Sequence, residues 1–314
     1  LSFPTTPAPL TMFSVVFKLP AGHYAEIGVD GRLKATRYWD AKPGLSTLDQ
    51  ELKGLSDSAQ ESLLVDGVRS RLRDAVGKRM MSDVPFGVFL SGGIDSSTNV
   101  ALMAELMDRP VDTFSVGFKD FKHLNELEYA DQVSKEFKTN HHEILIDEAD
   151  MKGYLGDLIH SQDEPIADWV CIPLYFVSKL AKDSGVTVVQ VGEGSDEQFC
   201  GYASYMGYLD LYQRYWSPYR KFTPTFARKA AAAVAQRLGR AVPKAEMYAD
   251  ILDRAARDRE HFWSGATVFW DTLKSRLVHK SAVKSNADYR PLIDSGLMPD
   301  SYLELDTFNV IKSF

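Results

Sequence analysis

Residues 88–97 read VFLSGGIDSS, and this stretch decides the fold of the chain. The apolar run at residues 84–90 is typical of a strand buried on both faces. It ends in Gly92 and Gly93, and a helix is expected from residue 96 to 107. Glycine permits positive φ and close backbone approach, and a helix N-terminus carries partial positive charge. The stretch therefore predicts an anion site at the carboxyl end of a parallel strand.

The surrounding sequence alternates helical and strand patterns. Helical spacing joins Leu63, Leu64, Val68, Leu72, Val76 and Met80 before the loop. Further strands are expected at residues 111–118, 142–146 and 186–191, and helices at residues 127–137, 151–159 and 172–183. This alternation predicts an α/β fold with a parallel sheet covered on both faces. After residue 202 only helices and turns are expected, so the C-terminal portion should be helical.

The two ends of the chain have weaker patterns. Residues 23–29 and 32–39 predict a hairpin around an Asp30-Gly31 turn, and residues 41–58 read as a linker. Residues 302–314 read as a helix without a stop signal, and the first residue is Leu. We therefore expect a fragment of a longer protein.

Composition narrows the class of protein. The net charge of −7 over 314 residues disfavours a nucleic-acid binder. Residues 219–244 hold seven Lys or Arg and no acid, which we interpret as a solvated helix face. Cys171 and Cys200 have no metal-ligand spacing, and neither a membrane-length apolar run nor a signal peptide is found. A cytoplasmic protein with no nucleic-acid or membrane partner is expected.

The loop SGGIDSS at residues 91–97 is specific in its chemistry. It lacks the lysine of a Walker loop and the spacing of the dinucleotide fingerprint. It resembles the pyrophosphate loop of enzymes that cleave ATP between the α and β phosphates, where Asp95 would serve as a Mg²⁺ ligand. The alternative is a glycine-rich turn capped by Ser96.

A second loop, VGEGSDE at residues 191–197, follows another buried strand. It carries three carboxylates, on Glu193, Asp196 and Glu197. Carboxylates beside phosphates require a metal or a cationic partner, so Asp95 and Asp196 could together hold Mg²⁺. The alternative is a helix N-terminus with an acidic first turn.

Both loops, in this order, resemble the synthetase domain of glutamine-dependent asparagine synthetases. The resemblance covers roughly residues 4–205 and includes LPAGHY at 19–24, RYWD at 37–40, FSVGF at 114–118, NHHE at 140–143 and DEPIAD at 163–168. It implies an ATP pyrophosphatase domain of the adenine-nucleotide α-hydrolase-like class. It also implies a glutaminase tail plus linker at residues 1–60 and a synthetase domain, incomplete at its C-terminus, at residues 61–314.

The resemblance also implies roles for individual residues. Glu193 would assist acyl-adenylate formation and handle the incoming amine, and Asp95 and Asp196 would bind Mg²⁺. Tyr202 would line the substrate pocket, and Asp168 either binds substrate or caps a helix. The ATP-binding residues would be Leu90, Ser91, Gly92, Gly93, Asp95, Ser96, Ser97, Val116, Val191 and Gly192.

The implied reaction has two steps and uses ATP and Mg²⁺. A carboxylate, aspartate in the family, attacks the α-phosphate to give acyl-AMP and diphosphate. Ammonia, released from glutamine in the full-length protein, then displaces AMP to form an amide. A homodimer is one expected assembly.

The sequence departs from the family at several points. Val191 replaces a serine, which would remove one nucleotide contact, and Cys200 replaces a glycine. Neither the glutaminase cysteine nor the family's C-terminal lysine motif is found. We therefore expect this chain to bind ATP weakly and to turn over little. A diphosphate-release assay with aspartate, ATP, Mg²⁺ and ammonia tests this, and brisk turnover would contradict it.

Other readings stay open from sequence alone. The loop also suits a tRNA-modifying, a β-lactam-forming or a sugar-acid amidating enzyme, and a non-catalytic nucleotide-binding partner is a further class. The motifs leave the acid substrate open, because pocket shape sets side-chain selectivity. The pair His141-His142 is interpreted as structural.

Overall fold

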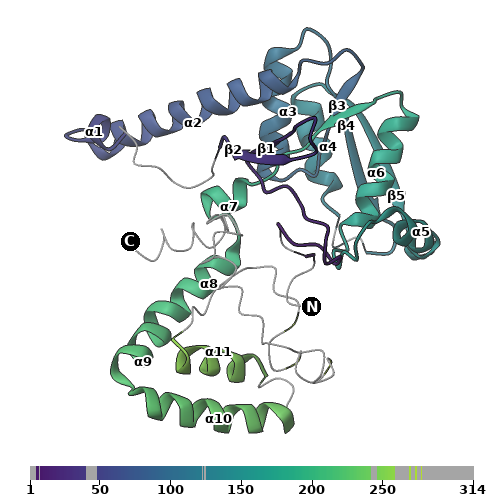
Figure 1. The fold of residues 1–314 in the computed structure, drawn as a ribbon. Coiled ribbons are helices and arrows are strands. Elements are labelled where there is room, and N and C mark those ends of the chain that lie inside the picture. Colours follow the sequence, from purple (N-terminus) through teal and green to yellow (C-terminus); the bar gives the residue numbers. More distant parts are fainter. Residues whose placement is uncertain are drawn as a thin grey trace. The chain divides into compact units, whose positions relative to one another are not determined.

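The computed structural model describes residues 5–6, 8–39, 48–121, 123, 125–241 and 246–258, together with residues 269, 273 and 277. The chain divides into two compact units. Their helices and strands are labelled in Figure 1. Unit 1 comprises residues 1–43, 164–167 and 195–314, and unit 2 comprises residues 44–163 and 168–194. The division into a glutaminase tail with linker at residues 1–60 and a synthetase domain at residues 61–314 stays a prediction.

Unit 2 is built on a four-stranded sheet. Its strands are β3 (Phe86–Phe89), β4 (Asp112–Phe118), β5 (Asn140–Ile146) and β6 (Val188–Gln190). They lie in the order β5-β4-β3-β6, and every neighbouring pair is parallel. The α/β fold with a parallel sheet is therefore confirmed.

Helices cover both faces of this sheet: α3 (Ile94–Leu106), α4 (Leu127–Glu136), α5 (Glu148–Ser161) and α6 (Cys171–Asp183). On one face Val88 and Leu90 pack against Val100 of α3 and Ala130 of α4. The other face has a separate core in which Phe114, Phe89 and Val116 pack with Val177 and Ala181 of α6. Burial on both faces explains why the strands read as continuous apolar runs.

The strands differ in length at their carboxyl ends. The ladder between β3 and β4 ends at the pair Phe89↔Phe114, whereas the ladder between β4 and β5 continues to Phe118↔Ile146. The strand order also reverses at β3, since β4 lies on one side of it and β6 on the other. Ligands of open α/β sheets bind at such a point, outside the carboxyl ends of the strands.

Two helices precede the sheet in unit 2. The helix α1 (Leu48–Leu52) lies within residues 41–58, so the prediction of a linker was wrong for these five residues. One helical turn is too short to show apolar periodicity. The helix α2 (Asp57–Arg79) is capped by Ser56, whose Oγ accepts from Ala59 N at 3.4 Å. Val76 and the following Met80 pack on the core, whereas Leu63, Leu64, Val68 and Leu72 are exposed.

Unit 1 holds a hairpin and a series of helices. Strands β1 (His23–Ile27) and β2 (Leu33–Arg37) pair antiparallel, as predicted, although both are shorter than the sequence indicated. The helices are α7 (Ser195–Phe199), α8 (Ala203–Leu211), a π-helical turn η2 (Tyr212–Trp216), α9 (Ser217–Phe222), α10 (Thr225–Ala241) and α11 (Glu246–Ala256). The helical C-terminal portion is thus confirmed for the residues described there, and the helix predicted at 302–314 lies outside them. Among the described helices, none is long and apolar enough to cross a bilayer.

Contacts between α10 and α11 hold this part of unit 1 together. Arg228 Nη1 donates to Ala255 O at 2.6 Å and to Asp258 Oδ1 at 2.8 Å. Gln236 Nε2 donates to Asp253 Oδ1 at 3.0 Å. The basic stretch at 219–244 was interpreted as a solvated face, but one of its side chains, Arg228, is buried and holds α10 to α11.

Candidate nucleotide site

The loop after β3 runs directly into helix α3. Gly93 is the residue before the helix, and no side chain caps the N–H groups of the first turn. The loop is held by its own hydroxyls: Ser91 N donates to Ser96 Oγ at 3.2 Å, and Gly93 N donates to Ser91 Oγ at 3.2 Å. Since uncapped N–H groups at a helix start attract anions, the first turn of α3 is suited to a phosphate group.

Gly92 shapes this loop because it packs against helix α4. Its φ is +86°, in the left-handed region that favours glycine. A Cβ at this position would lie 2.5 Å from Tyr129 Cβ and 2.7 Å from Ala130 N. Only glycine therefore lets the loop lie this close to α4.

The first residues of the second loop, which belong to unit 2, lie next to the first loop. Strand β6 pairs with β3, and a Cβ placed on Gly192 would lie 3.5 Å from Asp95 Cβ. Val191 and Glu193, on either side of Gly192, are both exposed. The fold thus brings Gly192 beside Asp95, as expected if both loops serve one ligand, although the individual roles stay predictions.

Asp196 and Tyr202 belong to unit 1. Gly201 N donates to Asp196 O at 3.0 Å, and the Asp196 carboxylate packs over Gly201 so closely that a Cβ there would collide with it. Tyr202 OH donates to Glu197 Oε1 at 2.8 Å. Because Asp95 lies in unit 2, its pairing with Asp196 around a metal stays a prediction.

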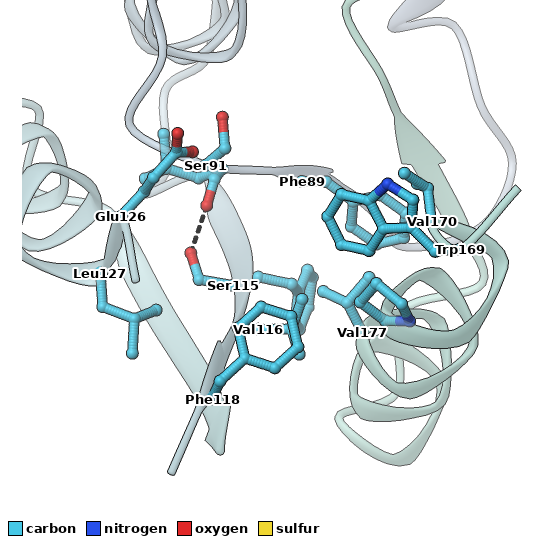
Figure 2. A pocket seen from close by; sticks show the side chains of 13 residues that line it. Phe89, Ser91, Ser115, Val116, Phe118, Glu126, Leu127, Trp169, Val170 and Val177 are labelled. Carbon is cyan, nitrogen blue, oxygen red and sulfur yellow. Dashed lines mark hydrogen bonds between the residues drawn. The ribbon is translucent and has the colours of Figure 1, made fainter. Parts of the chain in front are cut away.

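A pocket of about 280 Å³ opens in unit 2 where β3 and β4 end. Three of the predicted ATP-binding residues, Leu90, Ser91 and Val116, line it together. Figure 2 shows Ser91 and Val116 among the lining side chains. The other lining residues are Phe89, Phe114, Ser115, Phe118, Glu126, Leu127, Trp169, Val170, Pro173 and Val177. Neither Val191 nor Asp168 lines this pocket, although Asp168 directly precedes two residues that do.

Sequence reasoning missed several of these residues. Ser115 donates from Oγ to Leu90 O and so ties β4 to the end of β3. Phe118 N donates to Asn125 Oδ1 at 2.6 Å, which fixes the approach to α4. Glu126 and Trp169 gave no motif signal. Strand alternation within residues 114–118 could have identified Phe118, because it shares a face with Phe114 and Val116.

Asp168 closes a turn just before α6. Its Oδ1 accepts from Val170 N at 3.0 Å, the geometry of a turn closed by an Asp side chain. Glu164, in unit 1, accepts from Met12 N and from Lys18 Nζ, each at 3.0 Å, and the ammonium lowers the pKa of this carboxyl. The substrate role of Asp168 stays a prediction, in addition to its observed hydrogen bond in this turn.

A charged cluster lies beyond the carboxyl ends of β4 and β5. A backbone hydrogen bond from Asp150, with help from Lys119, lowers the pKa of Asp147 from 3.8 to about 2. The hydrogen bond between Lys119 and Asp147 in turn raises the pKa of Lys119. Since Asp147 and Asp150 form a reciprocal cap at the start of α5, we interpret this cluster as structural.

The adjacent histidines also make internal contacts. His141 Nδ1 is 2.8 Å from Thr113 Oγ1 and its Nε2 is 3.1 Å from Glu143 Oε1. The ring of His142 stacks on Phe114 with centroids 5.0 Å apart. These contacts support the structural interpretation of the pair.

Cys200 adopts a conformation that favours glycine. Its φ is +58°, and burial raises the pKa of its thiol. Replacing it by glycine, Cys200→Gly, should stabilise unit 1 by about 0.5–1 kcal/mol, because the left-handed strain of a Cβ-bearing residue disappears. A higher thermal midpoint would confirm this, and a Cys200→Ala variant, which keeps the Cβ, should not show the gain.

Comparison with known proteins decides the family. The asparagine synthase profile matches residues 67–294, which include both loops and the whole sheet. The chain belongs to the asparagine synthase family. Its resemblance to glutamine-dependent asparagine synthetases is thereby confirmed at the level of the family.

Three relatives illustrate how similar this chain is to individual proteins. A putative asparagine synthetase of Methanocaldococcus jannaschii is 36% identical over 64% of this chain and 36% of its own length. Asparagine synthetase 1 of Bacillus subtilis is 31% identical over 88% of this chain and 40% of its own length. A protein named amidase chyE, from Penicillium rubens, is 28% identical over 73% of the chain and 35% of its own length. The chain thus spans 35 to 40% of the length of these three relatives.

Proposed function

We propose that this asparagine synthase family chain carries the ATP-using site of an amide-forming ligase. The observation that carries the proposal is the uncapped first turn of α3, which follows Gly92-Gly93 and lies beside a pocket lined by Leu90, Ser91 and Val116. The loop would hold the phosphates and the pocket the adenosine. ATP and Mg²⁺ are the proposed cofactors.

The residues of the chain suit the first step, attack of a carboxylate on the α-phosphate. Backbone N–H groups of the loop and of α3 would neutralise the departing diphosphate. A Mg²⁺ ion held by Asp95 and Asp196 would add positive charge at the same oxygens. Positioning and charge neutralisation supply most of the catalysis in such a transfer.

In the second step ammonia attacks the acyl-adenylate and AMP leaves. Glu193 is exposed and directly follows Gly192, which lies beside Asp95, and this position in the chain supports a role for it at the proposed phosphate site. We propose that Glu193 accepts a proton from the attacking amine. Aspartate as the acid, and glutamine as the source of ammonia, are proposed from the resemblance to the asparagine synthetases.

An ATP–diphosphate exchange assay on the full-length protein tests this proposal. Labelled diphosphate should enter ATP only when a carboxylic acid and Mg²⁺ are both present, because the adenylation step is reversible. Aspartate should be the best acid in a panel that includes uronic acids. Formation of ADP in place of AMP would refute the adenylation chemistry, whereas preference for another acid would refute only the substrate.

A further inference from the structure

Trp169 is a pocket residue that the proposed mechanism does not use. It stands two residues before the first residue of α6, Cys171, and is 67% exposed. An indole left in water gains little hydrophobic stabilisation from the fold. Figure 2 shows it beside Phe89, Val170 and Val177, across the pocket from Ser91, Glu126 and Leu127.

The backbone on both sides of Trp169 is fixed. Val170 N donates to Asp168 Oδ1 at 3.0 Å, and Ile172 N donates to Trp169 O at 3.3 Å. Two hydrogen bonds thus anchor the residue at the start of a helix whose Val177 and Ala181 belong to the core. The indole is therefore presented at the pocket by a rigid element, which reduces the entropy lost when a ligand binds.

The pocket is polar at one end and apolar at the other. Its polar side chains are Ser91, Ser115 and Glu126, and Ser91 belongs to the phosphate loop. The side where Trp169 lies is lined by aromatic and aliphatic groups, including Phe89 and Val177. A flat heterocycle joined to a polar group that can hydrogen-bond matches this gradient, with the phosphates lying outside the pocket on the loop that follows Ser91.

We propose that Trp169 stacks on the base of the bound nucleotide and closes the apolar end of the pocket. This inference rests on the proposed nucleotide site. Stacking on an aromatic face tolerates any base, since every base has a π-face. Trp169 would therefore strengthen binding of the nucleotide without choosing between adenine and guanine.

Titration of the chain with ATP, GTP and inorganic diphosphate, each with Mg²⁺, tests the proposal by calorimetry. In Trp169→Ala the affinities for ATP and GTP should both fall about tenfold, while diphosphate should bind unchanged. Trp169→Phe should recover most of the loss. Trp39, which is 60% exposed in unit 1, supplies the matched control, and Trp39→Ala should bind all three ligands as the wild type does.

Fluorescence gives a second readout. ATP should quench tryptophan emission in the wild type and in Trp39→Phe, and this quenching should disappear in Trp169→Phe. Unchanged ATP affinity in Trp169→Ala would overturn the inference and leave the proposed function standing. Equal weakening of ATP and diphosphate would also overturn it, because Trp169 would then act through the phosphate loop. A wild-type chain that binds diphosphate but not ATP would refute the proposed function itself.

Discussion

Replacing Gly92 by alanine should destabilise the protein by about 3 kcal/mol and weaken ATP binding at least tenfold. The added Cβ would lie 2.5 Å from Tyr129 Cβ and 2.7 Å from Ala130 N, and φ is +86°. The atoms it meets belong to helix α4 and its backbone, so no side-chain rotation relieves the overlap. The phosphate loop must shift, and the N–H groups that it presents shift with it. Thermal unfolding and calorimetric titration with ATP measure the two effects.

Gly54→Ala separates packing from backbone strain. Gly54 lies in the same unit with φ of +87°, and nothing comes within 4 Å of a Cβ built there. The Gly54→Ala variant should lose only about 1 kcal/mol of its free energy of unfolding, which is the cost of the left-handed conformation, and should bind ATP as the wild type does. If the two variants lose equal stability, contact with α4 is not what requires glycine at position 92.

Replacing Asp95 by asparagine should abolish the dependence of ATP binding on Mg²⁺. In the wild type, Mg²⁺ should strengthen ATP binding by roughly 100-fold, since Asp95 would help to hold an ion that neutralises phosphate charge. The amide keeps the size of the side chain but removes the charge that the ion requires. Titration of ATP with and without Mg²⁺ checks the prediction for each protein.

Glu128→Gln is the matched control for this variant. Glu128 is the acidic residue in the first turn of α4, as Asp95 is in the first turn of α3. Each substitution should cost about 0.3–1 kcal/mol of stability through the lost interaction with the helix dipole. Only Asp95→Asn should change the response to Mg²⁺. An equal Mg²⁺ response in all three proteins would rule out Asp95 as a metal ligand.

Much of the candidate site was readable from sequence because it lies at two strand ends. A buried apolar run that stops at two glycines before a helix predicts an anion site, so the loop at Ser91, Gly92 and Gly93 was proposed directly from the residues, whereas Leu90 was proposed from the family resemblance. The roles of Val191 and Gly192 came from the family resemblance, and the structure supports the position of Gly192 beside Asp95. Short helices were harder to predict. Nothing in the sequence indicated α1, because a helix of one turn carries no periodic signal.

Trp169 and Glu126 could not be identified in this way. Each lies just before or at the start of a helix, far along the chain from residues 88–97, and becomes a pocket residue only because α4 and α6 pack on opposite faces of the sheet. The motifs name the residues that we propose bind phosphate through local backbone geometry. Residues that form the walls of a pocket are selected by long-range packing.

The sequence by itself determined the parallel α/β fold, the phosphate loop and the family, because periodicity and glycine positions are local properties of the chain. Only the tertiary structure decided that β3 stops at Phe89 while β4 continues to Phe118, which opens the pocket. It also decided that Gly92 packs on α4 and that Trp169 lines the pocket where β3 and β4 end. These features depend on which helix covers which face of the sheet, and that choice follows from burial of side chains distant in sequence.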